Sequence, residues 1–233
     1  MSFYKTLTPY YDDIFPANEK TLAFLAAHFK EGASVLDVGA GTGNMALALA
    51  QKGFHVTAME PEESMAEQIR LKAQTQQLSI IVTTNSMQQL GTLEESYQGI
   101  YCIGNTLPHL HDMEEIRAFF QQTFEKLQPE GVFIFQIVNF DKKDFIFPVI
   151  EKEDFLFERQ YVRDGKHILF TTSLSTKEGV QTNTISLYPA TAAQLYPLLE
   201  ACGFESITTY GNFALKAYNH DAPALIMVAM KGN

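Results

Sequence analysis

The sequence predicts an α/β fold, in which a mostly parallel sheet carries helices on both faces and an antiparallel insertion is added. Short runs rich in β-branched and aromatic residues alternate with amphipathic runs through the first 140 residues. The strand-like runs lack two-residue alternation, which is typical of strands covered on both faces. A later stretch, 155–189, is strand-like throughout and contains no helical pattern.

Five strands are expected in the first part of the chain, at 33–38, 54–59, 79–84, 99–103 and 131–138. The first runs through a glycine turn into a helix, and apolar residues at helical spacing predict further helices within 18–32, 60–77 and 112–131. Pro61 suits a first helical position, and Asp112 with Glu115 suggests a capping box. Pro129 and Gly131 are expected to end the last of these helices.

The stretch 155–189 predicts three antiparallel strands, with turns at 164–165 and 178–179. The α/β pattern returns with a helix that begins near Thr191, where Gln194 completes a capping box, and with a final strand at 224–231. We expect 1–143 and 190–233 to form the core. The segment 144–189 is then an antiparallel insertion that acts as a lid or a dimer contact.

Composition and charge narrow the class of partner. Apolar residues make up 46% of the 233 residues, enough for a large core, and the net charge is −10. That charge argues against nucleic acid and against an anionic membrane surface, which both need clustered Lys and Arg. No apolar run approaches the ~20 residues of a membrane span. The two cysteines and a polar start predict a cytoplasmic protein.

The stretch VLDVGAGTGNMALALA, residues 35–50, indicates a nucleotide site at a strand–turn–helix corner. No P-loop motif is present. The turn also departs from the dinucleotide pattern, because Gly43 comes one residue early and Asn44 takes the place of the third glycine. Asp37 would oppose a pyrophosphate at the helix N-terminus, but it suits the cationic methionine moiety of S-adenosylmethionine. Glu60 ends the second strand, where an acid can accept hydrogen bonds from ribose hydroxyls.

With these motifs the chain resembles the class I S-adenosylmethionine-dependent methyltransferases, in their small-molecule (type 11/25-like) branch. The first motif is followed by similar segments, VTAMEPEESM, VTTNSMQQL, YCIGNTLPHL and LEACGFESI. The resemblance covers roughly residues 20–140 and 190–233. It implies a Rossmann-like, doubly wound, seven-stranded sheet whose last strand is antiparallel. It also implies S-adenosyl-L-methionine as cofactor and S-adenosyl-L-homocysteine as product.

The resemblance carries the family's cofactor contacts onto particular positions. Glu60 would bind the ribose and Met65 the adenine, although core packing explains Met65 equally well. Asn85 stands where the family usually has Asp, and the backbone near Asn105 would meet the methionine ammonium. In YYDDIF, Tyr11 would fold over the cofactor, with an anchoring helix as the alternative. The expected cofactor-binding set is Tyr11, Asp37, Gly39, Ala40, Gly41, Asn44, Glu60, Pro61, Met65, Asn85, Ser86, Met87, Gly104, Asn105 and His109.

Catalytic signals are faint, because methyl transfer from a sulfonium depends mainly on alignment. His109, after the fourth strand, is the candidate base, or else a loop residue that shapes the cofactor site. On the insertion, Arg159 or Arg163 could hold a substrate carboxylate, and Tyr161 could flank the acceptor. The alternative is a small sheet with solvated arginines. No metal site is expected, and 139–141 is interpreted as a loop.

The expected function is S-adenosylmethionine-dependent methyl transfer to nitrogen or oxygen of a small molecule. No Pro-Cys pair and no Asn-Pro-Pro-Tyr-type motif, as in nucleic-acid methyltransferases, occurs in the sequence. One alternative is an NAD-dependent oxidoreductase, and another is a cofactor-binding regulatory module without catalysis. The sequence predicts a monomer or a homodimer, and it leaves the acceptor open.

Overall fold

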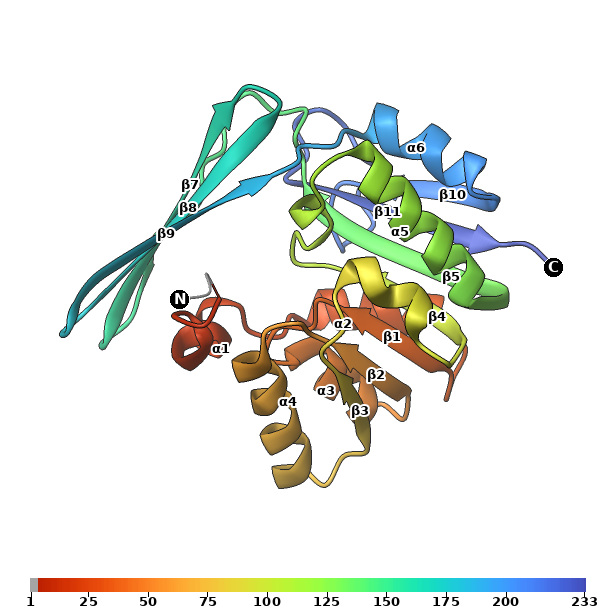
Figure 1. The fold of residues 1–233 in the computed structure, drawn as a ribbon, viewed down its shortest axis with the longest axis horizontal. Coiled ribbons are helices and arrows are strands. Elements are labelled where there is room, and N and C mark those ends of the chain that lie inside the picture. The colour runs from red at the N-terminus through yellow and green to blue at the C-terminus, as the bar shows by residue number, and fades with distance from the viewer. Residues whose placement is uncertain (1–3) are drawn as a thin grey trace.

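A computed structural model describes residues 4–233. Figure 1 shows a large sheet with helices on both sides, and a narrow second sheet that extends away from it. The short N-terminal helices η1 (Thr8–Tyr10) and α1 (Tyr11–Ile14) lie beside the second sheet.

The large sheet has seven strands in the order β10-β11-β5-β4-β1-β2-β3. Only β11 runs antiparallel to its neighbours β5 and β10. The Rossmann-like sheet with an antiparallel last strand is therefore confirmed. The strands are β1 (Ser34–Val38), β2 (His55–Met59), β3 (Ile80–Thr83), β4 (Tyr97–Cys102), β5 (Leu127–Val138), β10 (Phe204–Tyr210) and β11 (Ala224–Lys231).

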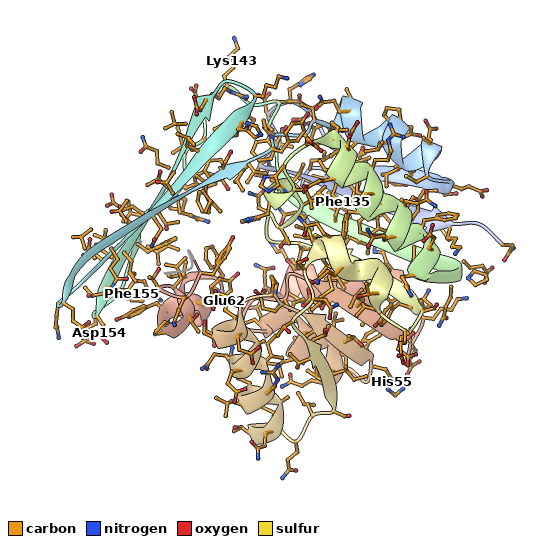
Figure 2. The ribbon with its side chains drawn as sticks, in the orientation of Figure 1. His55, Glu62, Phe135, Lys143, Asp154 and Phe155 are labelled. Carbon is orange, nitrogen blue, oxygen red and sulfur yellow. The ribbon has the colours of Figure 1, made fainter. Side chains whose placement is uncertain are left out.

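Helices cover both faces of this sheet and bury two hydrophobic clusters. Phe24, Leu49 and Ile69 pack on one face, and Phe120 and Leu199 on the other. The first face carries α2 (Glu19–His28), α3 (Asn44–Gln51) and α4 (Glu63–Thr75); the second carries η2 (Met87–Thr92), α5 (Met113–Lys126) and α6 (Ala192–Ala201). Phe135, labelled in Figure 2, is one of the fully buried side chains of β5.

The insertion is a four-stranded antiparallel sheet in the order β6-β7-β8-β9. Three strands were expected, and the two-residue β6 pairs with β7 as a fourth. The two turns are two-residue loops at 165–166 and 177–178, since Asp164 pairs with His167 and Thr176 with Gly179. The strands are β6 (Ile150–Glu151), β7 (Phe155–Asp164), β8 (His167–Thr176) and β9 (Gly179–Leu187).

Several expected element ends are wrong. The helix predicted over 112–131 ends at Lys126, and β5 already begins at Leu127, because Leu127 pairs with Tyr97 ahead of an irregularity in the ladder. Asp112 caps this helix, but the Glu115 carboxylate accepts from the N–H of His111 and not from that of the cap. The Thr191–Gln194 capping box is present as expected.

The helix at α4 begins two residues after Pro61, at Glu63. The cause lies in Glu60, whose carboxylate accepts a hydrogen bond from the N–H of Glu62 and closes a tight turn there. Pro61 therefore precedes the helix cap instead of occupying the first helical position. This turn brings the Glu60 side chain back toward the strand ends.

A third cluster joins the N-terminal segment to the insertion. Leu7 and Ile14 pack against Phe155, Phe157 and Leu174 of the second sheet. Figure 2 labels Phe155 near α1, and its ring meets the Tyr10 ring edge-on at 5.1 Å between centroids. The N-terminal segment and the insertion therefore share one small core. Within residues 4–233, no helix has the length and apolarity needed to cross a membrane.

Candidate functional site

The glycine turn between β1 and α3 forms the floor of the candidate site. Gly39, Gly41 and Gly43 have φ values of +75°, +58° and +81°, which L-residues with a side chain rarely adopt. A Cβ on Gly41 would lie 2.8 Å from the Tyr11 ring, and one on Gly43 would lie 2.8 Å from Ile69. The turn therefore requires glycine both for its backbone and for its close neighbours.

Four N–H groups of this turn are already hydrogen-bonded within the protein. Those of Gly39 and Ala40 donate to the Met59 carbonyl at 2.8 and 3.1 Å, and that of Gly43 donates to Ala40. The N–H of Gly41 donates to Glu60 Oε2 at 2.8 Å. A phosphate at a helix N-terminus needs free N–H groups, so these four positions do not provide a phosphate site.

Two buried carboxyl groups lie at this corner. Burial raises the pKa of Glu60 to about 7, against the opposing hydrogen bonds from the N–H groups of Glu62 and Gly41. Burial also raises the pKa of Asp37 to about 7, and the nearby Glu60 adds to that rise. A ligand that brings positive charge or hydroxyl donors to this corner would therefore stabilise the ionised form of these carboxyl groups.

A cavity of about 360 Å³ opens above the turn. Its walls come from the ends of β1, β2, β3 and β4, as expected for a ligand site in a doubly wound sheet. Predicted cofactor residues that line it are Tyr11, Gly39, Gly41, Glu60, Pro61, Met65, Asn85, Ser86, Met87, Gly104 and His109. Lining residues that the sequence reasoning missed are Tyr4, Met59, Glu62, Gln88, Ile103 and Thr106. Figure 2 places Glu62 on the side of the α/β part that faces the second sheet.

Four predicted cofactor residues do not line this cavity. Asp37 and Ala40 line neither this cavity nor its neighbour, and Asp37 is only 2% exposed beneath the turn. Asn44 faces away, because its Nδ2 donates to the Phe15 carbonyl at 3.0 Å and its Oδ1 accepts from Lys72. Asn105 lines the second cavity instead.

Asn85 is held in one orientation at the end of β3. Its Oδ1 accepts from the Thr83 hydroxyl, and its Nδ2 donates to Thr92 Oγ1 at 3.1 Å. The carbonyl oxygen keeps a second lone pair, which can accept from a ligand amino group. An uncharged amide at this position can therefore still recognise such a group.

The N-terminal segment closes one side of the site. The Tyr11 side chain lines both cavities, whereas the Tyr10 ring packs on Phe155. Asp12, one residue on, bonds the Thr42 hydroxyl and forms an ion pair with Lys72. Tyr11 is thus the inward-facing tyrosine of YYDDIF, and its neighbour fixes α1 to the glycine turn.

His109 ends η3 (Leu107–His109) and lines both cavities. Its Nε2 lies 2.9 Å from the Tyr4 hydroxyl. Burial lowers the pKa of His109 to about 4, so the ring is neutral at pH 7. Burial likewise raises the pKa of Tyr4 well above its usual range, so this partner is a neutral phenol.

A second cavity of about 240 Å³ adjoins the first and shares Tyr4, Tyr11, Gly104 and His109 with it. Arg159 and Tyr161 of β7 line it. Arg163 does not, because its Nη2 donates to the backbone carbonyls of residues 140 and 142. The insertion therefore supplies one wall of the second cavity, and its role as a lid or a dimer contact stays a prediction.

The loop 139–141 acts as an anchor for the C-terminal part of the chain. The Tyr218 hydroxyl lies 2.8 Å from Asn139 Oδ1 and 2.6 Å from Asp141 Oδ2. Asn139 Nδ2 donates to three backbone carbonyls between residues 219 and 222. Over residues 4–233, no three His, Cys, Asp or Glu side chains group in a way that could hold a metal ion.

Comparison with known proteins agrees with this geometry. Residues 35–131 match the family described as a methyltransferase domain. A putative methyltransferase of Geobacillus sp. (strain WCH70) is 32% identical over 127 residues, 53% of this chain and 50% of that protein. The chain thus matches about half the length of that relative.

Two further proteins are similar over most of the chain. A glycine/sarcosine N-methyltransferase of Aphanothece halophytica is 24% identical over 208 residues, 84% of this chain and 76% of that protein. The structure of the CcbJ methyltransferase from Streptomyces caelestis superposes with a TM-score of 0.84 at 23% identity and covers 97% of this chain and 96% of its own. This likeness shows a shared fold across both sheets.

Proposed function

We propose that the chain is a class I S-adenosylmethionine-dependent methyltransferase that methylates nitrogen or oxygen of a small molecule. The matched methyltransferase segment at residues 35–131 and the shared fold support this proposal. S-adenosyl-L-methionine would be held in the first cavity, and the acceptor in the second. The product of the cofactor would be S-adenosyl-L-homocysteine.

The observation that carries the proposal is the state of the glycine turn. Its N–H groups at Gly39, Ala40, Gly41 and Gly43 are bonded within the protein, and the Gly41 N–H donates to the Glu60 carboxylate. The buried carboxyl of Asp37 lies under the same turn, and its pKa of about 7 leaves it partly charged at neutral pH. These four positions offer no free N–H to the pyrophosphate of NAD, whereas the acids beneath them suit a cofactor with a cationic end and no phosphate.

The proposed cofactor supplies a methyl group that is already activated by a sulfonium. The chain then has to bind the cofactor and the acceptor, align them and exclude water. Glu60 would accept from the ribose hydroxyls, Asn85 would accept from the adenine amino group, and Met65 would contact the adenine. Tyr11 would cover the methionine end, where the two cavities meet.

The properties of His109 favour an amine acceptor over a hydroxyl. With its pKa lowered to about 4, its imidazole is a weak base and is unsuited to deprotonate an alcohol. An amine must be neutral to attack: an aromatic amine already is at pH 7, and an aliphatic ammonium ion releases its proton to solvent before it enters the site. The neutral amine then gains from a hydrogen-bond acceptor that orients its N–H. The Tyr4–His109 pair would supply that acceptor beside both cavities.

The proposal is tested by measuring S-adenosylhomocysteine formation with a panel of amines, phenols and carboxylic acids. We expect turnover with at least one amine. His109→Gln should lower kcat by about tenfold or more with little change in cofactor affinity, since an orienting contact would be lost. His111→Gln is the matched control, because the His111 side chain lines neither cavity.

Two outcomes would contradict the proposal. Binding of NAD without binding of S-adenosylhomocysteine would indicate an oxidoreductase. Binding of S-adenosylhomocysteine with no turnover across the whole panel would favour a cofactor-binding regulatory module.

A further inference from the structure

Arg159 places an unpaired cation in the second cavity. Its Nε is buried and has no hydrogen-bond partner. None of the ion pairs among residues 4–233 involves it. The residue as a whole is half-buried. Withdrawing a charge from water without a partner is costly, so an arginine in this state indicates a site whose anion comes from a ligand.

Aromatic rings hold the Arg159 guanidinium in place. Its Cζ lies 4.9 Å from the centroid of the Phe147 ring, 5.5 Å from that of Phe15 and 5.9 Å from that of Phe157. Such contacts stabilise a cation without using its N–H donors. The guanidinium is thus oriented, and its N–H groups remain available to a ligand. Their planar arrangement matches the two oxygens of a carboxylate.

Tyr161 offers a second donor to the same space. Its hydroxyl oxygen accepts from Asn105 Nδ2 at 2.9 Å, and Asn105 is itself fixed because its Oδ1 accepts from the Val138 N–H. The O–H proton of Tyr161 is therefore not used by Asn105. Burial raises the pKa of Tyr161 above its usual range, so the phenol keeps this proton.

The two cavities differ in the sign of their charge. Among the described residues 4–233, no carboxylate lines the second cavity, and Arg159 is the one cationic side chain that does. The first is lined by Glu60 and Glu62. A molecule that spans the second cavity therefore has its anionic end drawn to β7 and its other end left beside Tyr4 and His109, which line both cavities.

We infer that the acceptor is a small organic acid, whose carboxylate pairs with Arg159 and accepts from Tyr161 while its amine lies beside His109. This inference rests on the proposed function, since it assigns the second cavity to the acceptor. It adds a substrate class and two specificity-determining residues. The aromatic walls at Phe15, Phe147 and Phe170 favour an acid with an apolar or aromatic body.

The test is calorimetric titration of the protein saturated with S-adenosylhomocysteine, using matched pairs of acid and primary amide. The pairs are glycine, alanine, phenylalanine and 4-aminobenzoate, each against its own amide. We expect at least one acid to bind about tenfold or more tightly than its amide, the gain typical of a hydrogen bond to a charged group. Arg159→Met should abolish this preference, and Arg159→Lys should keep part of it.

Arg163→Gln serves as the matched control. Arg163 lies on the same strand but donates to backbone carbonyls outside the cavity, so this variant should keep the preference for the acid. If S-adenosylhomocysteine does not bind at all, the proposed function itself fails. If it binds, but no acid binds more tightly than its amide, or the preference survives in Arg159→Met, this inference is overturned. An equal loss of S-adenosylhomocysteine affinity in Arg159→Met would assign the arginine to the cofactor and would also overturn it.

Discussion

Gly41 shows how one absent side chain shapes the first cavity, where we propose that the cofactor binds. A Cβ at this position would lie 2.8 Å from the Tyr11 ring, and φ is +58°. Gly41→Ala should therefore push Tyr11 out of place and lower the affinity for S-adenosylhomocysteine by about tenfold or more, since small misplacements at such sites are expensive. Calorimetry measures the affinity.

Gly32→Ala is the matched control for that substitution. Gly32 has a similar φ of +68°, but a Cβ there meets nothing within 4 Å. Both variants should lose about 1–2 kcal/mol of stability from the left-handed backbone, and only Gly41→Ala should lose affinity. Equal affinities in the two variants would contradict the role given to Tyr11.

The raised pKa of Glu60 predicts that cofactor binding depends on pH. Its pKa is raised to about 7 by burial, so part of it is protonated in the free protein at neutral pH. A ligand hydroxyl that donates to the carboxylate favours the charged form and lowers this pKa. Binding at pH 7 should therefore release protons, and affinity for S-adenosylhomocysteine should fall as the pH drops below 7.

Calorimetry in two buffers of different ionisation enthalpy measures this proton release. Glu60→Gln should reduce it, and the part that remains comes from Asp37, whose pKa is also raised to about 7. Glu63→Gln is the control, because Glu63 is paired with Arg70 at the surface. Equal apparent enthalpies of wild type in both buffers would contradict the prediction.

Individual site residues could be predicted where the backbone motif fixes their place. Gly39, Gly41 and Glu60 follow from the spacing of the glycine turn and the end of β2, and they line the cavity as expected. Tyr4 was missed because it reaches His109 across 105 residues of sequence, and no local pattern signals such a contact. Whether these residues bind the cofactor stays a prediction.

At the scale of elements, α1 is attached to the glycine turn through Asp12. Its carboxylate bonds Thr42 and pairs with Lys72 on α4. Asp12→Asn should loosen this attachment and speed amide exchange of residues 4–15. The melting temperature should change by less than about 4 °C, because a half-exposed ion pair contributes about 1 kcal/mol at most.

Hydrogen exchange followed by mass spectrometry makes that measurement. Asp13→Asn is the control, since Asp13 is exposed and next in sequence. We expect a raised KM for S-adenosylmethionine only in the Asp12 variant, because Tyr11 moves with the segment. Unchanged exchange of residues 4–15 in Asp12→Asn would argue against this attachment.

The kinds of elements could be predicted from the sequence better than their ends. Buried strands and amphipathic helices have strong periodic signals, and these gave the order of the α/β part. The end of α5 was misplaced because Pro129 suggests a helix stop, whereas the chain is already extended in β5 from Leu127. The strand β6 was missed because a segment of two residues is too short to show the two-residue alternation of a strand.

At the scale of the whole molecule, two sheets and the N-terminal segment meet around two cavities. The seven-stranded sheet supplies the acidic corner, and the four-stranded sheet supplies Arg159. Leu7, Ile14 and Phe157 bind the N-terminal segment to the insertion as a single small core. The site is therefore completed by parts that are distant in sequence but packed together (Figure 1).

The most direct test of the account is a pair of calorimetric titrations of the full chain, one with S-adenosylhomocysteine and one with NAD. The bonded N–H groups of the turn and the acids beneath it predict micromolar binding of S-adenosylhomocysteine and no measurable binding of NAD. Micromolar binding of NAD with none of S-adenosylhomocysteine would contradict the central claim.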